Sequence, residues 1–221
     1  MVKAVFIDFY GTIVHEDGVV IKEVTQEIFD TGIVEDKSQI GKYWWNEFQT
    51  AFLNSFGECF ETQRELEYQS LVKTINHFQS TANAEELSDL MFEHWIKPPI
   101  FEESKYFFEA CPVPIYIVSN IDRADILKAI EYHNLKPTKV FTSEDAKSYK
   151  PRKELFELAL NTTGLSTNEV VHIGDSLSSD VKGAASLGIN VLWVNRSRRE
   201  VPCGVLSIEN LLEALNTPFL K

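Results

Sequence analysis

The sequence predicts an α/β protein in which a parallel sheet carries a helical insert after its first strand. Five short apolar segments of strand-forming residues indicate buried strands. Helical segments separate the later strands, and this alternation is typical of a parallel sheet with crossover helices. The predicted strands are residues 4–9, 114–118, 139–142, 170–173 and 190–194, and the predicted helices are residues 122–134, 152–162 and 179–187.

The first predicted strand, residues 4–9, is an apolar run that ends at a Gly-Thr turn and carries Asp8 at its C-terminal end. The other four strand segments are also largely apolar runs. Such runs are typical of strands in a parallel sheet, because crossover helices cover both of its faces. We therefore expect this sheet to be buried on both sides.

About 100 residues separate the first predicted strand from the second. A structureless loop of that length is uncommon, so the segment must contain structure of its own. It has few glycines and no strand-like alternation, and it ends at Lys97, which precedes two prolines. Aromatic residues recur in it every four positions, a spacing that we interpret as the buried face of a helical bundle rather than a ligand-stacking surface. They are Trp44, Phe48, Phe52 and Phe56.

The chain has 21 Lys and Arg residues against 33 Asp and Glu residues, which gives a formal net charge of −12. This balance argues against a nucleic-acid partner and against an anionic membrane surface, since both require clustered basic residues. No apolar run approaches the roughly 20 residues of a membrane span, and the N-terminal run is too short for a secretory signal. The three cysteines are scattered and give no disulfide framework. We therefore expect a soluble cytoplasmic protein. The sequence leaves the oligomeric state open.

Polar segments follow four of the predicted strands, at the edge where ligands bind in open α/β sheets. Each segment alone fits a turn, a helix cap or a solvated loop. Together they would bring three carboxylates, a hydroxyl and an ammonium to one place. The four segments are residues 8–12, 119–120, 150–151 and 174–180.

His172 lies inside a predicted strand and is interpreted as a packed histidine rather than a base.

The three carboxylates are Asp8, Asp175 and Asp180, which sum to −3. Crowding them without compensation would raise their pKa values and cost stability. One divalent cation and Lys150 would supply +3, and oxygen-only ligands suit Mg²⁺. A carboxylate can also attack phosphorus to form an aspartyl phosphate. The cluster therefore indicates metal-assisted phosphoryl chemistry.

The motifs Asp-x-x-Gly-Thr, strand plus Ser, Lys-Pro and Gly-Asp-Ser-x-x-x-Asp occur in this order over residues 8–180. In this order they resemble those of the haloacid dehalogenase superfamily. The resemblance implies a Rossmann-like core with a helical cap inserted after the first strand. We therefore expect residues 1–14 and 98–221 to form the core and residues 15–97 to form the cap.

The resemblance also implies a role for each motif residue. Asp8 would be the nucleophile and a metal ligand, and Asp175 and Asp180 would position Mg²⁺. Ser119 and Lys150 would hold the phosphoryl oxygens. Two further residues, Thr12 and Asn120, are assigned to the same binding site.

Tyr10 departs from the phosphatase pattern of this superfamily, which has a second Asp two residues after the nucleophile. That Asp protonates the leaving alcohol and then activates water. A phenol can donate a proton at neutral pH but is a poor base. The backbone carbonyl used for metal binding is kept at Tyr10, so the metal site can survive while turnover is reduced.

A Tyr at this position also resembles the true haloacid dehalogenases, which need no metal. Those enzymes use an Arg in the early cap, whereas the first Arg of this chain is Arg64. They also carry a Ser-Ser-Asn-type fourth motif in place of the acidic one found here. The sequence therefore favours a Mg²⁺-dependent phosphatase acting on a small phosphomonoester. A metal-independent 2-haloacid dehalogenase and a weakly catalytic phosphate-binding regulatory protein remain as alternatives.

Overall fold

The computed structural model describes all 221 residues and contains one six-stranded sheet in the order β3-β2-β1-β4-β5-β6, with every pair parallel. The predicted α/β class and all five predicted strands are confirmed, while the short edge strand β6 was not predicted. The strands are β1 (Ala4–Ile7), β2 (Ile115–Ser119), β3 (Lys139–Thr142), β4 (Val170–Gly174), β5 (Asn190–Val194) and β6 (Ser207–Ile208).

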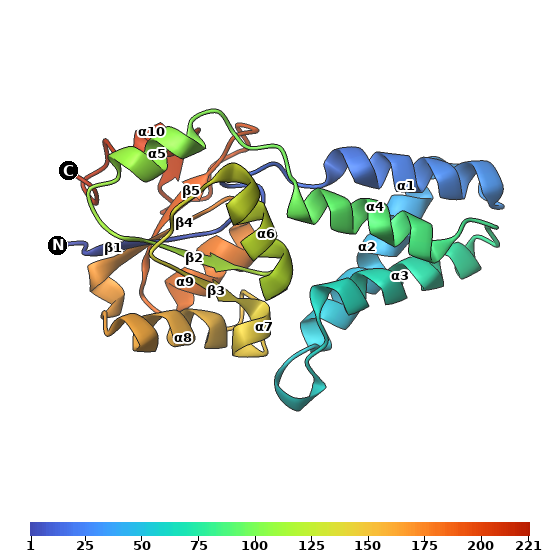
Figure 1. Cartoon of the computed structure of the whole chain (residues 1–221), viewed down its shortest axis with the longest axis horizontal. Helices are drawn as coiled ribbons and strands as arrows, with labels where there is room; N and C mark the ends of the chain where they lie inside the picture. The colour runs from blue at the N-terminus through green and yellow to red at the C-terminus, as the bar shows by residue number, and fades with distance from the viewer.

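Helices cover both faces of the sheet (Figure 1), and all four residues of β1 are buried. Alternate residues of β1 enter different apolar clusters: Val5 and Ile7 join the larger, and Ala4 and Phe6 the smaller. This follows from the two-residue period of a strand. Helices α5 (Ser104–Ala110), α6 (Arg123–His133) and α10 (Leu211–Ala214) pack in the larger cluster, and α8 (Glu154–Thr163) and α9 (Lys182–Ser186) in the smaller.

The segment between β1 and α5 forms four α-helices that project to one side of the sheet domain (Figure 1). Side-chain caps begin three of them: Asp36, Thr62 and Asn83 each accept a hydrogen bond from a backbone N–H of the first turn. None of the helices of the protein is both long and apolar enough to cross a membrane. The four are α1 (Gly18–Thr31), α2 (Lys37–Asn54), α3 (Gln63–His77) and α4 (Ala84–Ile96).

The two connections between this helical segment and the sheet domain run side by side. The His15 N–H donates to the Pro99 carbonyl at 2.8 Å, and Val14 forms an antiparallel bridge with Ile100. Helix α4 ends at Ile96, because the proline after Lys97 disfavours the helical conformation there. The expected boundary near residue 97 therefore coincides with a helix end.

The interpretation of the aromatic repeat as a buried face is wrong for most of its members. Trp44 is buried, but Phe48 and Phe52 are half-buried and Phe56 is exposed. The buried residues of α2 are only Ile40 and Trp44. Helix α2 packs in its bundle through that end, and the remainder of its aromatic face is turned toward the cavity described below.

Candidate active site at the carboxyl edge of the sheet

Three carboxylates meet where the central strands end. Asp8 directly follows β1, Asp175 follows β4, and Asp180 lies on the turn after it. Strands β1 and β4 are neighbours, with Ile7 paired to Ile173, so their ends reach the same edge. Oxygen atoms of the three carboxylates lie within 4.8 Å of one another.

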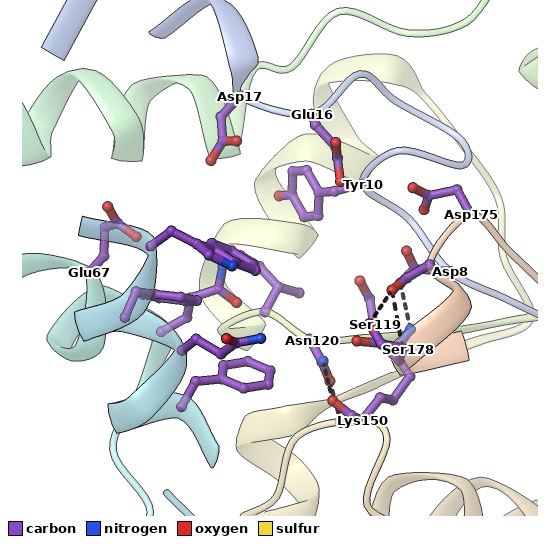
Figure 2. A pocket seen from close by; sticks show the side chains of 18 of the residues that line it. Asp8, Tyr10, Glu16, Asp17, Glu67, Ser119, Asn120, Lys150, Asp175 and Ser178 are labelled. Atoms are coloured by element: carbon purple, nitrogen blue, oxygen red, sulfur yellow. Dashed lines mark hydrogen bonds and ion pairs between the residues drawn. The ribbon is translucent and has the colours of Figure 1, made fainter. Parts of the chain in front are cut away.

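Lys150 connects two of these carboxylates, and Figure 2 shows its side chain reaching Asp8. Its Nζ donates to Oδ1 of Asp8 at 2.7 Å, to Oδ1 of Asp180 at 2.6 Å and to the Val118 carbonyl at 2.9 Å. The Lys150 residue is only 2% exposed. All three of its N–H donors therefore have partners, and the ammonium is fixed beside Asp8.

Two glycines allow the chain to approach this cluster closely. Gly11 has a φ of +82°, and a Cβ there would lie 2.6 Å from the carboxylate of Asp175. A Cβ at Gly174 would overlap the carboxylate of Asp180. These glycines are required because any side chain would displace a carboxylate from the cluster.

Asp180 is held by more groups than Lys150 alone. His172 Nε2 lies 2.9 Å from its Oδ1, and the Ser176 N–H donates to its Oδ2 at 3.0 Å. His172 is completely buried and packs against the ring of Phe156, which agrees with a packed histidine. The structure differs from the predicted helix over residues 179–187. Residues Leu177–Val181 form a wider π-helical turn, and α9 begins only at Lys182.

The pKa values of the three acids are shifted in different directions. Burial raises the pKa of Asp175 to about 8, and the charges of Asp8 and Asp180 add to this rise. Burial likewise raises the pKa of Asp8 against the opposing effect of Lys150. For Asp180, burial is outweighed by Lys150 and by His172, so its pKa is lowered. One ammonium does not compensate three acids, so the cluster favours binding of a further cation.

The remaining motif residues surround this cluster. Ser119 ends β2, is buried, and its hydroxyl acts beside Asp8 to lower the pKa of that acid. Asn120 exchanges two hydrogen bonds with the backbone of Lys150, at 2.7 and 3.0 Å. Thr12 donates to Oδ1 of Asp175 at 3.2 Å. The side-chain amide of Asn120, through its oxygen and its nitrogen, and the hydroxyl of Thr12 thus orient other site residues.

Tyr10 points away from the carboxylates and toward the helical segment. Its hydroxyl donates to the Trp95 carbonyl at 2.6 Å. Burial, followed by the charges of Asp125 and Asp8, raises the pKa of Tyr10 well above its usual value. The phenol is therefore neutral and its proton is already donated to a backbone acceptor.

A cavity of about 490 Å³ extends from the carboxylate cluster to the four-helix segment. Sequence reasoning did not identify its far wall as functional. The spacing of the aromatic residues was the one available signal for that wall, and nothing in the sequence distinguished its acids from surface acids. Residues contributed by the helical segment and its connection include Asp17, Trp44, Trp45, Phe48, Phe52 and Glu67.

The residues present fit a bound divalent metal ion. The candidate ligands are all carboxylate oxygens, they converge within one coordination sphere, and their charge is not balanced by the protein. Hard cations prefer such oxygen donors. Asp8, Asp175 and Asp180 could therefore hold a metal between them.

Known proteins resemble this chain over part of its sequence and over nearly all of its fold. The curated relatives include a phosphoserine phosphatase of Thermus thermophilus, 27% identical over 123 residues, which are 52% of this chain and 49% of that protein. The pyrimidine 5'-nucleotidase YjjG of Escherichia coli is 34% identical over 64 residues, which are 28% of each chain. The chain thus matches about half the length of these relatives or less.

Among solved structures, the HAD-hydrolase YfnB of Bacillus subtilis, bound to magnesium, matches with a TM-score of 0.77 and 20% identity, covering 97% of both chains. The L-2-haloacid dehalogenase of Xanthobacter autotrophicus matches with a TM-score of 0.76 and 17% identity, covering 98% of both. These two structures share the fold of this chain. A family model for haloacid dehalogenase-like hydrolases matches residues 2–188, and the chain therefore belongs to the haloacid dehalogenase-like hydrolase family.

Proposed function

We propose that the protein is a Mg²⁺-dependent phosphatase that cleaves a small phosphomonoester through an aspartyl phosphate at Asp8. The observation that carries this proposal is the cluster of Asp8, Asp175 and Asp180 with Lys150 fixed between two of them. The phosphatase and nucleotidase names of the sequence relatives support the same substrate class.

In the first step, a carboxylate oxygen of Asp8 attacks phosphorus, and the bond from phosphorus to the leaving oxygen breaks. The leaving oxygen takes a proton from solvent water to give the alcohol, because the Tyr10 proton is donated to the Trp95 carbonyl. Lys150 and the Ser119 hydroxyl orient Asp8 and stabilise negative charge on the transferring group. A bound Mg²⁺ would neutralise charge on the phosphoryl oxygens, and Asp8, Asp175 and Asp180 are the residues that would hold it.

In the second step, water attacks phosphorus of the aspartyl phosphate, which releases phosphate and restores the carboxylate of Asp8. This step needs a base to take a proton from the water. Tyr10 is unsuited to that role, because its hydroxyl is bound to Trp95 and its pKa is raised. We therefore expect hydrolysis of the intermediate to be slow, with phosphoenzyme accumulating during turnover.

Metal-independent dehalogenation is the second candidate, favoured by Tyr10 alone. A 2-haloacid carries a carboxylate that needs a cationic partner in the site. Among the residues lining the cavity, the cations are Lys150, whose donors are all used, and Lys182, which is exposed. Arg64 pairs with Asp125 instead. The acidic lining would be neutralised by a bound divalent cation, and it therefore favours the metal-dependent phosphatase over the metal-independent dehalogenase.

The test is a panel of phosphomonoesters assayed with Mg²⁺ and with EDTA, using Asp8→Asn as the blank. Phosphate release that requires both Mg²⁺ and Asp8 would support the proposal. Halide release from a 2-haloacid in EDTA would replace it with the dehalogenase. Phosphate binding without turnover in the wild type and in Tyr10→Asp would instead favour a regulatory phosphate-binding protein.

A further inference from the structure

Glu67 is the one buried carboxylate of this protein that has no hydrogen-bond donor. The buried acids are Asp8, Glu67, Asp122, Asp125 and Asp180. Lys150 donates to two of them, and the N-terminal residues of α3 donate to Asp122 and Asp125. Glu67 is 6% exposed, and its Oε1 is buried without a partner. An unpaired buried carboxyl group is costly, so its presence requires an explanation.

Glu67 lies in the wall of the cavity rather than in the packed interior. It lines the cavity from α3, and Figure 2 draws it with Asp17 at the end opposite Asp8. Gln63 lies one turn earlier on the same helix and also lines the cavity. Its Oε1 is likewise buried without a partner. Two neighbouring acceptors thus lack donors at this end of the cavity.

The charge around these acceptors is negative. Asp17 also lines the cavity, and Trp95 Nε1 donates to its carboxylate at 3.2 Å. Burial, followed by the charge of Asp17, raises the pKa of Glu67 to about 8. No basic side chain of the helical segment lines the cavity. A group that both carries positive charge and donates several hydrogen bonds would therefore be complementary to this end.

Aromatic side chains line the space between this end and the carboxylate cluster. Trp44, Phe48 and Phe52 contribute from α2. Trp45, beside them, is 59% exposed and also lines the cavity. Aromatic faces bind apolar groups and also attract cations through their quadrupole.

We propose that the far end of the cavity binds a protonated amine on the leaving group of the substrate, with Glu67 as its carboxylate partner. The leaving group has an apolar, preferably aromatic, body that lies against the side chains of α2. An ammonium has three N–H donors, enough for Glu67, Gln63 and Asp17. The proposal rests on the phosphatase function proposed above. It assigns the substrate to amino-alkyl or amino-aryl phosphomonoesters and excludes esters whose leaving group ends in a carboxylate or a second phosphate.

Two matched esters test the assignment: 4-(aminomethyl)benzyl phosphate and 4-methylbenzyl phosphate, assayed with Mg²⁺. We expect kcat/KM of the wild type to favour the amine about 10- to 100-fold, as a charge-assisted hydrogen bond implies. Glu67→Gln, which keeps the size of the side chain, should lower this ratio to about 3 or less. Glu85→Gln is the control, because Glu85 is an exposed acid of α4 outside the cavity, and it should keep the wild-type ratio.

Binding of the fragment 4-methylbenzylamine, followed by tryptophan fluorescence, separates this inference from the proposed function. If no phosphomonoester of the panel is hydrolysed, these two included, but the amine binds and Glu67→Gln weakens its binding, the phosphatase proposal fails and the amine site stands. If both esters are hydrolysed at equal rates, or the ratio survives in Glu67→Gln, the amine site is disproved. The fluorescence of Glu67→Gln without ligand checks that the variant is folded.

Discussion

The hydroxyl of Tyr10 donates a hydrogen bond to the main-chain carbonyl of Trp95 at 2.6 Å. This bond joins the loop after β1 to the last turn of α4. Because Tyr10 lies only two residues after Asp8, the bond ties the chain around Asp8 to the helical segment. The side chain at the position of the usual acid and base therefore holds the two parts of the protein together.

Replacement of Tyr10 by Asp should accelerate hydrolysis of the proposed phosphoenzyme. A carboxylate at this position can take a proton from water, which the phenol cannot, and general base catalysis contributes about 10²-fold or more. Rapid-quench experiments should find accumulated phosphoenzyme in the wild type and little in Tyr10→Asp. Fast dephosphorylation of the wild type in Mg²⁺ would show that another group supplies the base.

The core motifs could be predicted from sequence because they follow apolar strands. Ile7 and Ile173 are buried and paired, so Asp8 and Asp175 reach one edge as the strand pattern predicts. Strand β1 ends at Ile7, whereas the apolar run continues to Phe9, because Phe9 is buried in the loop and not in the sheet. An apolar run records burial and not hydrogen bonding, so strand ends are the least certain feature.

The far wall of the cavity could not be predicted in the same way. The four-residue spacing of Trp44, Phe48 and Phe52 shows that they share a helix face, but not whether that face meets its own bundle or the other domain. Glu67 looks like any acid of an amphipathic helix, since only tertiary packing buries it. Strand β6 has two residues, too few for a pattern.

The metal-free protein should lose stability as the pH rises from about 4 to about 8. Burial raises the pKa of Asp175 in the folded state to about 8, whereas an unperturbed aspartate has a pKa of 3.8. In this window the folded state binds more protons than the unfolded state, so the free energy of unfolding falls with rising pH. The pKa of Asp180 is lowered in the folded state, so this residue has the opposite effect on stability, and it has that effect at lower pH.

Urea unfolding in EDTA at pH 5.5 and pH 8 measures this effect. Asp175→Asn, which cannot ionise, should gain stability relative to the wild type as the pH rises. Addition of Mg²⁺ at pH 8 should stabilise the wild type and have little effect on the variant. If the difference in stability between the wild type and Asp175→Asn in EDTA is the same at pH 5.5 and at pH 8, the prediction is wrong.

Gly11→Ala should weaken metal binding by disturbing Asp175. Its φ of +82° and the 2.6 Å approach of a Cβ to the Asp175 carboxylate make the position unsuitable for alanine. Gly204→Ala is a matched control, because Gly204 has a φ of +81° with nothing within 4 Å of a Cβ. Both variants should lose about 1–2 kcal/mol of stability from the backbone conformation. Only Gly11→Ala should also lose Mg²⁺ affinity in calorimetric titration; equal affinity in the two variants would rule out this role for Gly11.

Arg64→Ala should loosen the attachment of the helical segment to the sheet domain. Nε and Nη2 of Arg64 donate to the two oxygens of Asp125, each at 2.7 Å, and Asp125 lies on α6 at 1% exposure. Removing Arg64 leaves that carboxylate without its cation, and separation of the two parts would let water solvate it. We expect a larger radius of gyration in small-angle scattering and a KM raised about tenfold for phosphate esters.

Arg123→Ala serves as the comparison for this prediction. Arg123 forms the same bidentate contact with Asp145, at 2.7 Å for both bonds, but both residues belong to the sheet domain. Its removal should lower stability without changing the radius of gyration or KM, because no contact with the helical segment is lost. Identical scattering from the two variants would mean that Tyr10 and the α3 N-terminus on Asp122 suffice to hold the helical segment in place.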